Sequence, residues 1–154
     1  MDATLCNSQC RRKVPLVEPM AEEIEAVISS PRGRVLVIED EFLIAAMVED
    51  LLADFECDCV GPIANLEEGV AAARTEIVDA AIINLMIQGK PAYAVTEALA
   101  ERNIPFCFAS GVRPTDLPER WRDRPFLTKP YVIADVRAFL VTVLPSLPGE
   151  KPAA

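Results

Sequence analysis

The sequence of 154 residues contains no histidine. A chain without histidine cannot form a Ser-His-Asp or Cys-His catalytic pair, ligate a metal or haem through imidazole, or carry a phosphohistidine. Long apolar runs are missing too, since no stretch approaches the roughly 20 residues of a membrane-spanning helix. The N-terminus, MDATLCNSQCRRK, is polar where a secretory signal would be apolar. These absences predict a cytoplasmic protein.

Positive charge is also scarce. The chain has 15 Lys and Arg residues against 24 Asp and Glu residues, which gives a net charge of -9. Nucleic acids and anionic membranes are both bound by clustered cations. We therefore expect no nucleic-acid partner and no membrane partner.

Cysteine occurs five times, an odd number, with no secretory signal before it. We therefore expect reduced thiols rather than a disulfide framework. Cys57 and Cys59 would share one face of a strand, where packing is favoured over metal binding because no second ligand pair exists. Cys6 and Cys10 stand beside a basic cluster that would lower their thiol pKa, but in a segment expected to be unstructured.

Proline and glycine divide the chain into three parts. Residues 1–33 form an N-terminal extension with three prolines, a basic cluster and room for one short helix over residues 19–28. Residues 145–154 hold three prolines and a glycine and are expected to be a disordered tail. Residues 34–144 remain as one domain of ordinary size.

Inside this domain, short apolar runs alternate with segments of helical period. The runs predict buried strands, and apolar residues at offsets of 3, 4, 7 and 8 predict amphipathic helices. The expected strands are Arg34–Glu39, Cys57–Val60, Asp79–Leu85, Pro105–Ala109 and Arg124–Thr128. The expected helices are residues 41–54, Leu66–Thr75, Pro91–Arg102 and Ile133–Leu144, with Asn65 as the N-cap of the second and Glu68 three residues on.

The segment between the fourth and fifth strands is too rich in proline for a full helix. Pro114 and Pro118 limit any helix there to about residues 118–122. Strands that alternate with helices form βαβ units with right-handed crossovers. The predicted fold is therefore α/β, a doubly wound five-stranded parallel sheet with a degenerate fourth helix.

In such a sheet, the residues just after the strands meet at one edge, where ligands bind. Here that edge collects carboxylates, an amide, a hydroxyl and an ammonium group: Glu39, Asp40, Glu41, Asn84, Ser110 and Lys129. Carboxylates with an open side suit Mg2+, and a lysine with a hydroxyl suits a phosphoryl group. Taken alone, the three acidic residues would be explained by the N-terminus of the next helix. The full set predicts a pocket for a metal and a phosphoryl group.

Four stretches, VLVIEDEFLI, AAIINLMIQG, PFCFASG and FLTKPY, resemble the signature segments of response-regulator receiver domains, in the same order. The match covers about residues 34–144. The FASG stretch and the short fourth helix further resemble the FAT GUY receivers of alphaproteobacteria, with Ser110 where that group has threonine. The resemblance implies a flavodoxin-like, CheY-like fold.

The resemblance also implies a role for individual residues. Asp40 would bind Mg2+ directly and Glu39 through water, while Met86 would offer its backbone carbonyl. Ser110 and Lys129 would bind the phosphoryl group, and the peptide bond after Lys129 would be cis.

One position departs from the family pattern. Asn84 stands where the family has its phosphoacceptor aspartate, and a neutral amide is a poor nucleophile and a weak metal ligand. Asp79 begins the same strand, about 17 Å away, and cannot replace it. One charge at about 4 Å from a neighbour is worth roughly 4 kcal/mol at an effective dielectric of 20. Weak Mg2+ binding and no phosphorylation at the usual site are therefore expected.

These features predict a stand-alone receiver protein of two-component phosphorelay signalling that is not an enzyme. It would act as an atypical pseudo-receiver by contact with a histidine kinase, a phosphotransferase or another signalling protein. One alternative is a receiver domain of a hybrid kinase, and another is a normal receiver whose acceptor has been replaced. An alternative of another class is a structural partner-binding module with a vestigial pocket.

The contact surface is expected near the end of the domain. Phe126 stands at the switch-aromatic position of the family, and Trp121 and Tyr131 lie in short, proline-flanked segments where burial is difficult. Exposed aromatic residues there would anchor a partner. Four apolar residues are expected to pack the last helix on the sheet: Ile133, Val136, Leu140 and Val143.

Overall fold

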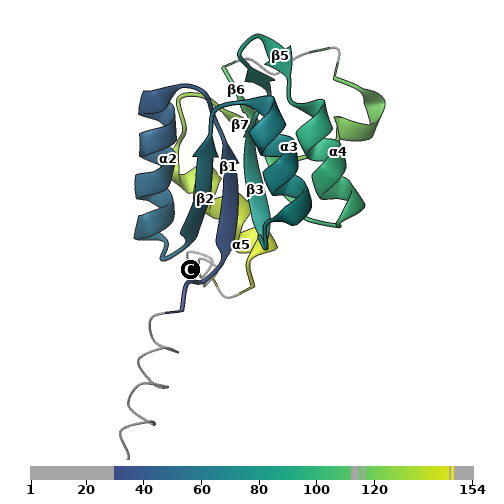
Figure 1. Ribbon diagram of the computed structural model, residues 1–154. Helices are drawn as coiled ribbons and strands as arrows, with labels where there is room; N and C mark the ends of the chain where they lie inside the picture. The colour runs from purple at the N-terminus through teal and green to yellow at the C-terminus, as the bar shows by residue number, and fades with distance from the viewer. Residues whose placement is uncertain (1–29, 112–114, 116, 146, 148–154) are drawn as a thin grey trace, which may run out of the picture. The chain divides into compact units, whose positions relative to one another are not determined.

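Five parallel strands form the central sheet in the order β2-β1-β3-β6-β7 (Figure 1). They are β1 (Arg34–Ile38), β2 (Asp58–Ile63), β3 (Ala80–Asn84), β6 (Phe106–Ser110) and β7 (Phe126–Thr128). The structure is a computed structural model that describes residues 30–111, 115, 117–145 and 147. The prediction of a doubly wound, five-stranded parallel sheet is confirmed.

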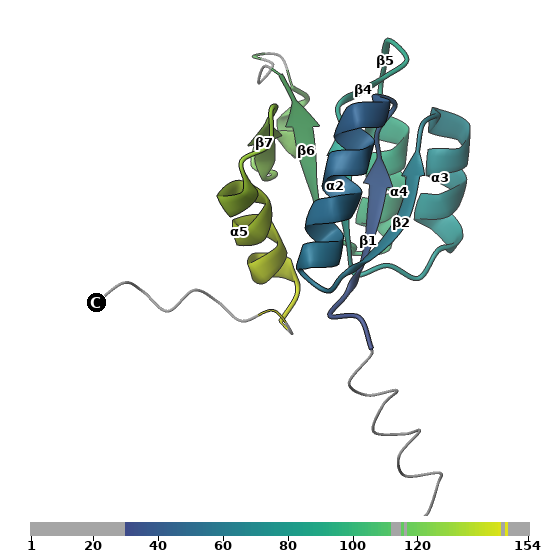
Figure 2. The ribbon, with the colours of Figure 1, turned by 90° about the vertical axis from the view of Figure 1, so that its left-hand side faces the viewer.

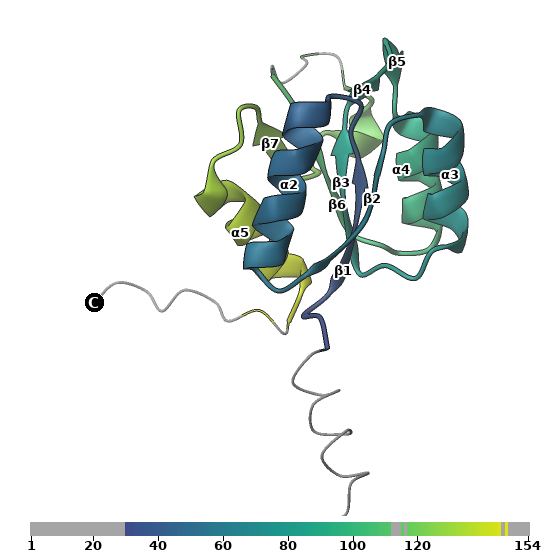
Figure 3. The same ribbon diagram turned by 60° about the vertical axis from the view of Figure 1, so that its left-hand side comes forward.

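Two helices cover each face of this sheet (Figures 2 and 3). On one face lie α2 (Phe42–Asp54) and α5 (Ile133–Val143), and on the other lie α3 (Leu66–Thr75) and α4 (Tyr93–Glu101). Each face has its own apolar cluster, so the central strands are buried on both sides. This is why β1 and β3 read as continuous apolar runs in the sequence.

The segment that replaces the fourth helix is a single 3-10 turn, η1 (Glu119–Trp121), within the limits that the two prolines predict. The expectation that Trp121 is exposed is wrong, because its side chain is almost fully buried. The turn folds the indole back onto Phe106 and Phe108, with ring centroids 5.5 and 6.5 Å away. The tryptophan thus fills space above the sheet that a full helix would otherwise cover.

Local signals place some elements better than others. Asn65 caps α3 as predicted, since its side chain accepts a hydrogen bond from the Glu68 N–H. Strand β2, expected to end before Gly61, continues through Pro62 to Ile63. A proline is tolerated there because β2 is an edge strand with one unpaired side.

The core assignment for α5 is correct in the middle of the helix and wrong at its start. Val136 and Leu140 are fully buried, whereas Ile133 is 60% exposed. Ile133 is the first residue of α5, so the stripe that packs on the sheet begins only with the next turn. Val143 is half-buried against the same cluster.

The cysteines of the described residues are core residues, as expected for Cys57 and Cys59. Both pack in the cluster under α2 and α5, together with Cys107. Burial raises the pKa of the Cys59 thiol to about 11, and it raises the pKa of Cys57 and of Cys107 as well.

The folded domain extends slightly beyond the predicted bounds of residues 34–144 at both ends. The N–H of Arg32 donates to the Glu56 carbonyl at 2.8 Å, and Leu147 is buried. The predicted helix over residues 19–28, Cys6 and Cys10, and most of the predicted tail lie outside the described residues. Within the described part of the chain, every helix is too short or too polar to cross a lipid bilayer.

Candidate functional site

The parallel pairing of the strands brings their carboxyl ends to one edge of the sheet. Ile38 pairs with Ile83, so the residues after β1 stand beside the end of β3. β1 and β3 are also the pair at which the strand order reverses, which is where a doubly wound sheet opens a crevice. Glu39 and Asp40, which we call the acidic pair, therefore lie beside Asn84, as the sequence predicts.

Asn84 connects both members of the acidic pair. Its side-chain Nδ2 donates to Glu39 Oε1 at 3.0 Å and to Asp40 Oδ1 at 2.9 Å. Asn84 and Glu39 are both buried, at 6% and 3% exposure, so these hydrogen bonds are shielded from water. The amide orientation follows from charge, because an amide oxygen facing two carboxylates would be repelled.

Lys129 forms ion pairs with Glu39 and Glu41. Its Nζ lies 2.6 Å from Glu39 Oε2 and 3.2 Å from Glu41 Oε1. The Lys129 side chain is 9% exposed, so this ion pair is almost dry. The backbone N–H of Lys129 also donates to the Ser110 carbonyl at 2.9 Å, which fixes the lysine beside the end of β6. The peptide bond from Lys129 to Pro130 is cis, as the resemblance implies.

Gln88 is a site residue that sequence reasoning missed. It lies in the turn between the short strands β4 (Met86–Ile87) and β5 (Lys90–Pro91), and its N–H donates to Asp40 Oδ2 at 2.8 Å. Gln88 and Gly89 have φ values of 50° and 78°, which is the backbone of a type I′ hairpin turn. The signal in the sequence was the pair Gln88-Gly89, four residues after Asn84, in a stretch for which the sequence predicts no helix or strand.

The remaining predicted site residues lie around this centre. Ser110 is the last residue of β6 and is half-buried. Met86 follows Asn84 by two residues and begins β4, with its side chain exposed. Phe126 begins β7 and packs, half-buried, against the cluster under α3 and α4.

Tyr131 is half-buried, and its role in partner contact stays a prediction. Its ring is half-buried against the cluster under α2 and α5. Burial raises its pKa, and the negative charge of Glu39 raises it further.

Chemically, the amide of Asn84 and the ammonium of Lys129 are each paired with carboxylates of this site. The two Nδ2 hydrogens of Asn84 serve two carboxylates, and the ammonium of Lys129 serves Glu39 and Glu41. Across the described residues, no three Asp, Glu, Cys or His side chains are arranged to hold a metal ion. The carboxylate that would attack a phosphoryl group is absent at position 84.

The fold, the cis peptide bond and the residues at the strand ends define a receiver domain. The chain belongs to the response-regulator receiver family. Among solved structures, it resembles SdrG from Sphingomonas melonis Fr1 at 38% identity and a TM-score of 0.65, over 72% of this chain and 95% of SdrG. No family model and no curated protein matches the chain.

Two further structures share this fold. The response regulator PhyR from Brucella abortus is 26% identical with a TM-score of 0.64, over 82% of this chain and 54% of PhyR. The receiver domain of the sensor histidine kinase PA1611 from Pseudomonas aeruginosa PAO1 is 16% identical over 73% of this chain and 98% of that domain. Its TM-score is 0.59, and its structure has a magnesium ion coordinated in the active-site cleft. A receiver role in two-component signalling follows for this chain.

Proposed function

We propose that this receiver acts by protein contact and takes no phosphoryl group at position 84. The observation that carries the proposal is the pair of hydrogen bonds from Asn84 Nδ2 to Glu39 and Asp40. The amide donates a hydrogen bond to each carboxylate and so holds the two together. In a pocket with an aspartate at this position, a cation would have to bridge the carboxylates instead. An amide is also no nucleophile toward phosphorus.

The partners that we propose are a histidine kinase, a phosphotransferase or another signalling protein. This rests on the family of the chain and on its net charge of -9, which disfavours nucleic acids and anionic membranes as partners. The chain would carry no catalytic activity of its own, since the pocket offers neither a nucleophile nor a histidine.

Magnesium would bind weakly in this pocket. Asp40, Glu39 and the backbone carbonyl of Met86 are the residues that would hold it, and the ion would supply positive charge beside phosphoryl oxygens. It would have to displace the amide hydrogens of Asn84 from both carboxylates. It would also be repelled by the ammonium of Lys129, which already pairs with Glu39.

Intact mass after incubation with acetyl phosphate and Mg2+ tests the proposal. We expect no phosphate on the unchanged protein and Mg2+-dependent phosphorylation of Asn84→Asp. Asn103→Asp, which adds a carboxylate at an exposed position, serves as the matched control and should stay unmodified.

Two results would change the proposal. A phosphate mapped to position 84 of the unchanged protein would overturn it. A folded Asn84→Asp that remains unmodified would show that the pocket has decayed further, and would favour a structural partner-binding module.

A further inference from the structure

A groove adjoins the acidic pair on the side of α2. It has a volume of about 310 Å3 and lies between α2 and the turn that follows β2. Phe42, Ala45, Ala46 and Glu49 line it at offsets of 3, 4 and 7, so they share one face of the helix. The side chains of the two alanines are small, so space remains unfilled beside them. Phe42 and Glu49 stand at the two ends of this space, about 10 Å apart along the axis of α2 at 1.5 Å per residue.

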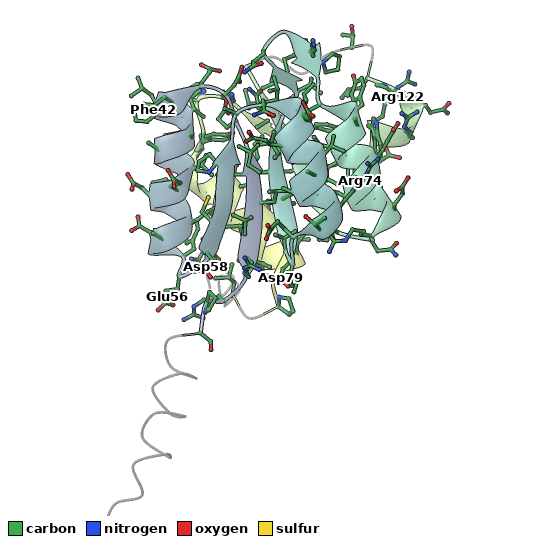
Figure 4. The ribbon with its side chains drawn as sticks, viewed as in Figure 1. Phe42, Glu56, Asp58, Arg74, Asp79 and Arg122 are labelled. Atoms are coloured by element: carbon green, nitrogen blue, oxygen red, sulfur yellow. The ribbon has the colours of Figure 1, made fainter. Side chains whose placement is uncertain are left out.

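The aromatic end of the groove is open to solvent. Phe42 is 82% exposed, and Figure 4 shows it projecting outward from the upper end of α2. The next residue, Leu43, is 80% exposed but does not line the groove. A ring held at the rim of a hollow is available to a partner without any rearrangement of the core.

The groove carries negative charge that the described residues do not neutralise. Glu39, Asp40 and Glu49 all line it, and its lining contains no lysine or arginine. Of these three, only Glu39 is in an ion pair within the described part of the chain, with Lys129. Asp40 accepts hydrogen bonds from two neutral donors, Asn84 Nδ2 and the Gln88 N–H, which leave its charge uncompensated.

We propose that this groove binds an arginine side chain of the partner protein. The inference rests on the proposed function, because the arginine would supply the positive charge that a metal supplies in a phosphorylatable pocket. A guanidinium pairs with carboxylates in a planar fork, so Glu49 and Asp40 are suitable partners for it. The ring of Phe42, at the other end from Glu49, can pack on the rest of the arginine side chain. The methylene stem of the arginine fits against the alanines and Pro62.

An arginine suits this groove better than a bare metal ion. Mg2+ requires six oxygen ligands in octahedral geometry, whereas much of this lining is aromatic, alanine or proline. The dipole of α2 disfavours a cation within its first turn, where the carboxylate of Asp40 offsets it, and Glu49 lies two turns further along.

The probe for this inference is N-acetyl-arginine amide, titrated into the isotope-labelled full chain and followed by amide chemical shifts. N-acetyl-citrulline amide, which has the same shape without the charge, is the matched ligand. We expect saturable shifts around Phe42, Glu49 and Ala64 with arginine, and an apparent Kd at least fivefold weaker with citrulline.

Variants separate the groove from general attraction to an acidic protein. Glu49→Gln should weaken arginine binding at least threefold, while Glu67→Gln, an exposed change on α3, should not. Phe42→Ala should weaken it as well, while Leu43→Ala, at the equally exposed neighbour, should not. All four positions are exposed, so the variants should fold.

Equal affinities for arginine and citrulline, or an unchanged Kd in Glu49→Gln, would overturn the inference. The mass experiment with acetyl phosphate is independent of this titration. A protein that stays unphosphorylated but does not bind arginine would refute the groove alone, whereas phosphate on position 84 would refute the proposed function.

Discussion

Asparagine and aspartate have nearly the same shape, yet at position 84 they reverse the roles of the pocket. An aspartate would add a third negative charge beside Glu39 and Asp40 and would offer no hydrogen to either. The asparagine offers two hydrogens and uses both. The nitrogen of the amide, in place of a carboxylate oxygen, thus lets the site form internal hydrogen bonds where an aspartate would need a cation.

Lys129 is the second residue on which this arrangement depends. Replacing it by methionine would leave Glu39, whose side chain is 1% exposed, as a buried charge without its cation. Removing one partner of a buried ion pair costs about 3 to 5 kcal/mol. We expect Lys129→Met to lower the free energy of unfolding by about 3 kcal/mol, measured by urea titration.

The control for this prediction is the double variant Lys129→Met with Glu39→Gln. It should recover much of the lost stability, because the unpaired charge is then removed as well. A single variant that loses less than about 1 kcal/mol would show that Glu39 is better solvated than its burial implies.

At the scale of elements, the sequence predicts best those helices and strands whose ends carry a local signal. Helix α3 begins and ends as expected, since Asn65 caps it. β2 was cut short because Gly61 and Pro62 read as a break, and only its place at the edge of the sheet permits them. Trp121 was misjudged because its burial depends on Phe106 and Phe108 in a different strand.

The cap of α3 can be tested directly. Asn65→Ala removes the acceptor for the Glu68 N–H, and loss of such a cap costs about 1 kcal/mol. Asn65→Asp keeps an acceptor oxygen and should be close to neutral. The comparison is made by thermal and urea unfolding, and equal losses in both variants would contradict the capping role.

The sequence predicts where the residues of the site lie in the fold, but it does not predict the hydrogen bonds between them. Parallel topology alone brings Glu39, Asp40 and Asn84 to one edge, and strand ends are legible in the sequence. The hydrogen bonds between them join residues 44 and 45 positions apart, and their geometry depends on the packed sheet. The backbone contact from Gln88 requires the hairpin turn, which no apolar pattern announces.

For the molecule as a whole, stability at alkaline pH depends on three buried or half-buried thiols and one half-buried phenol. Burial raises the pKa of Cys57, Cys59, Cys107 and Tyr131 in the folded protein. In the unfolded chain, thiols ionise near pH 8.5 and tyrosine near pH 10. Above these values the unfolded chain binds fewer protons than the folded one, so stability must fall as pH rises.

We therefore expect the free energy of unfolding to be nearly constant from pH 7 to 8 and to decline steadily above about pH 8.5. Each such group contributes at most about 1.4 kcal/mol per pH unit. Urea titrations in reducing buffer at pH 7, 8.5 and 10 would measure the decline. Cys107→Ala should make it shallower, and a curve that stays level to pH 10 would contradict the prediction.

The codons for asparagine and aspartate differ only in their first base. The carboxylate that Asn84 lacks is therefore a single mutation away, while Glu39, Asp40 and Lys129 still surround the position. Such a mutation recurs in any large population, so we expect selection to be what keeps the amide in place. Under the proposed function, a chain that regained its acceptor would take up phosphoryl groups that the amide now excludes.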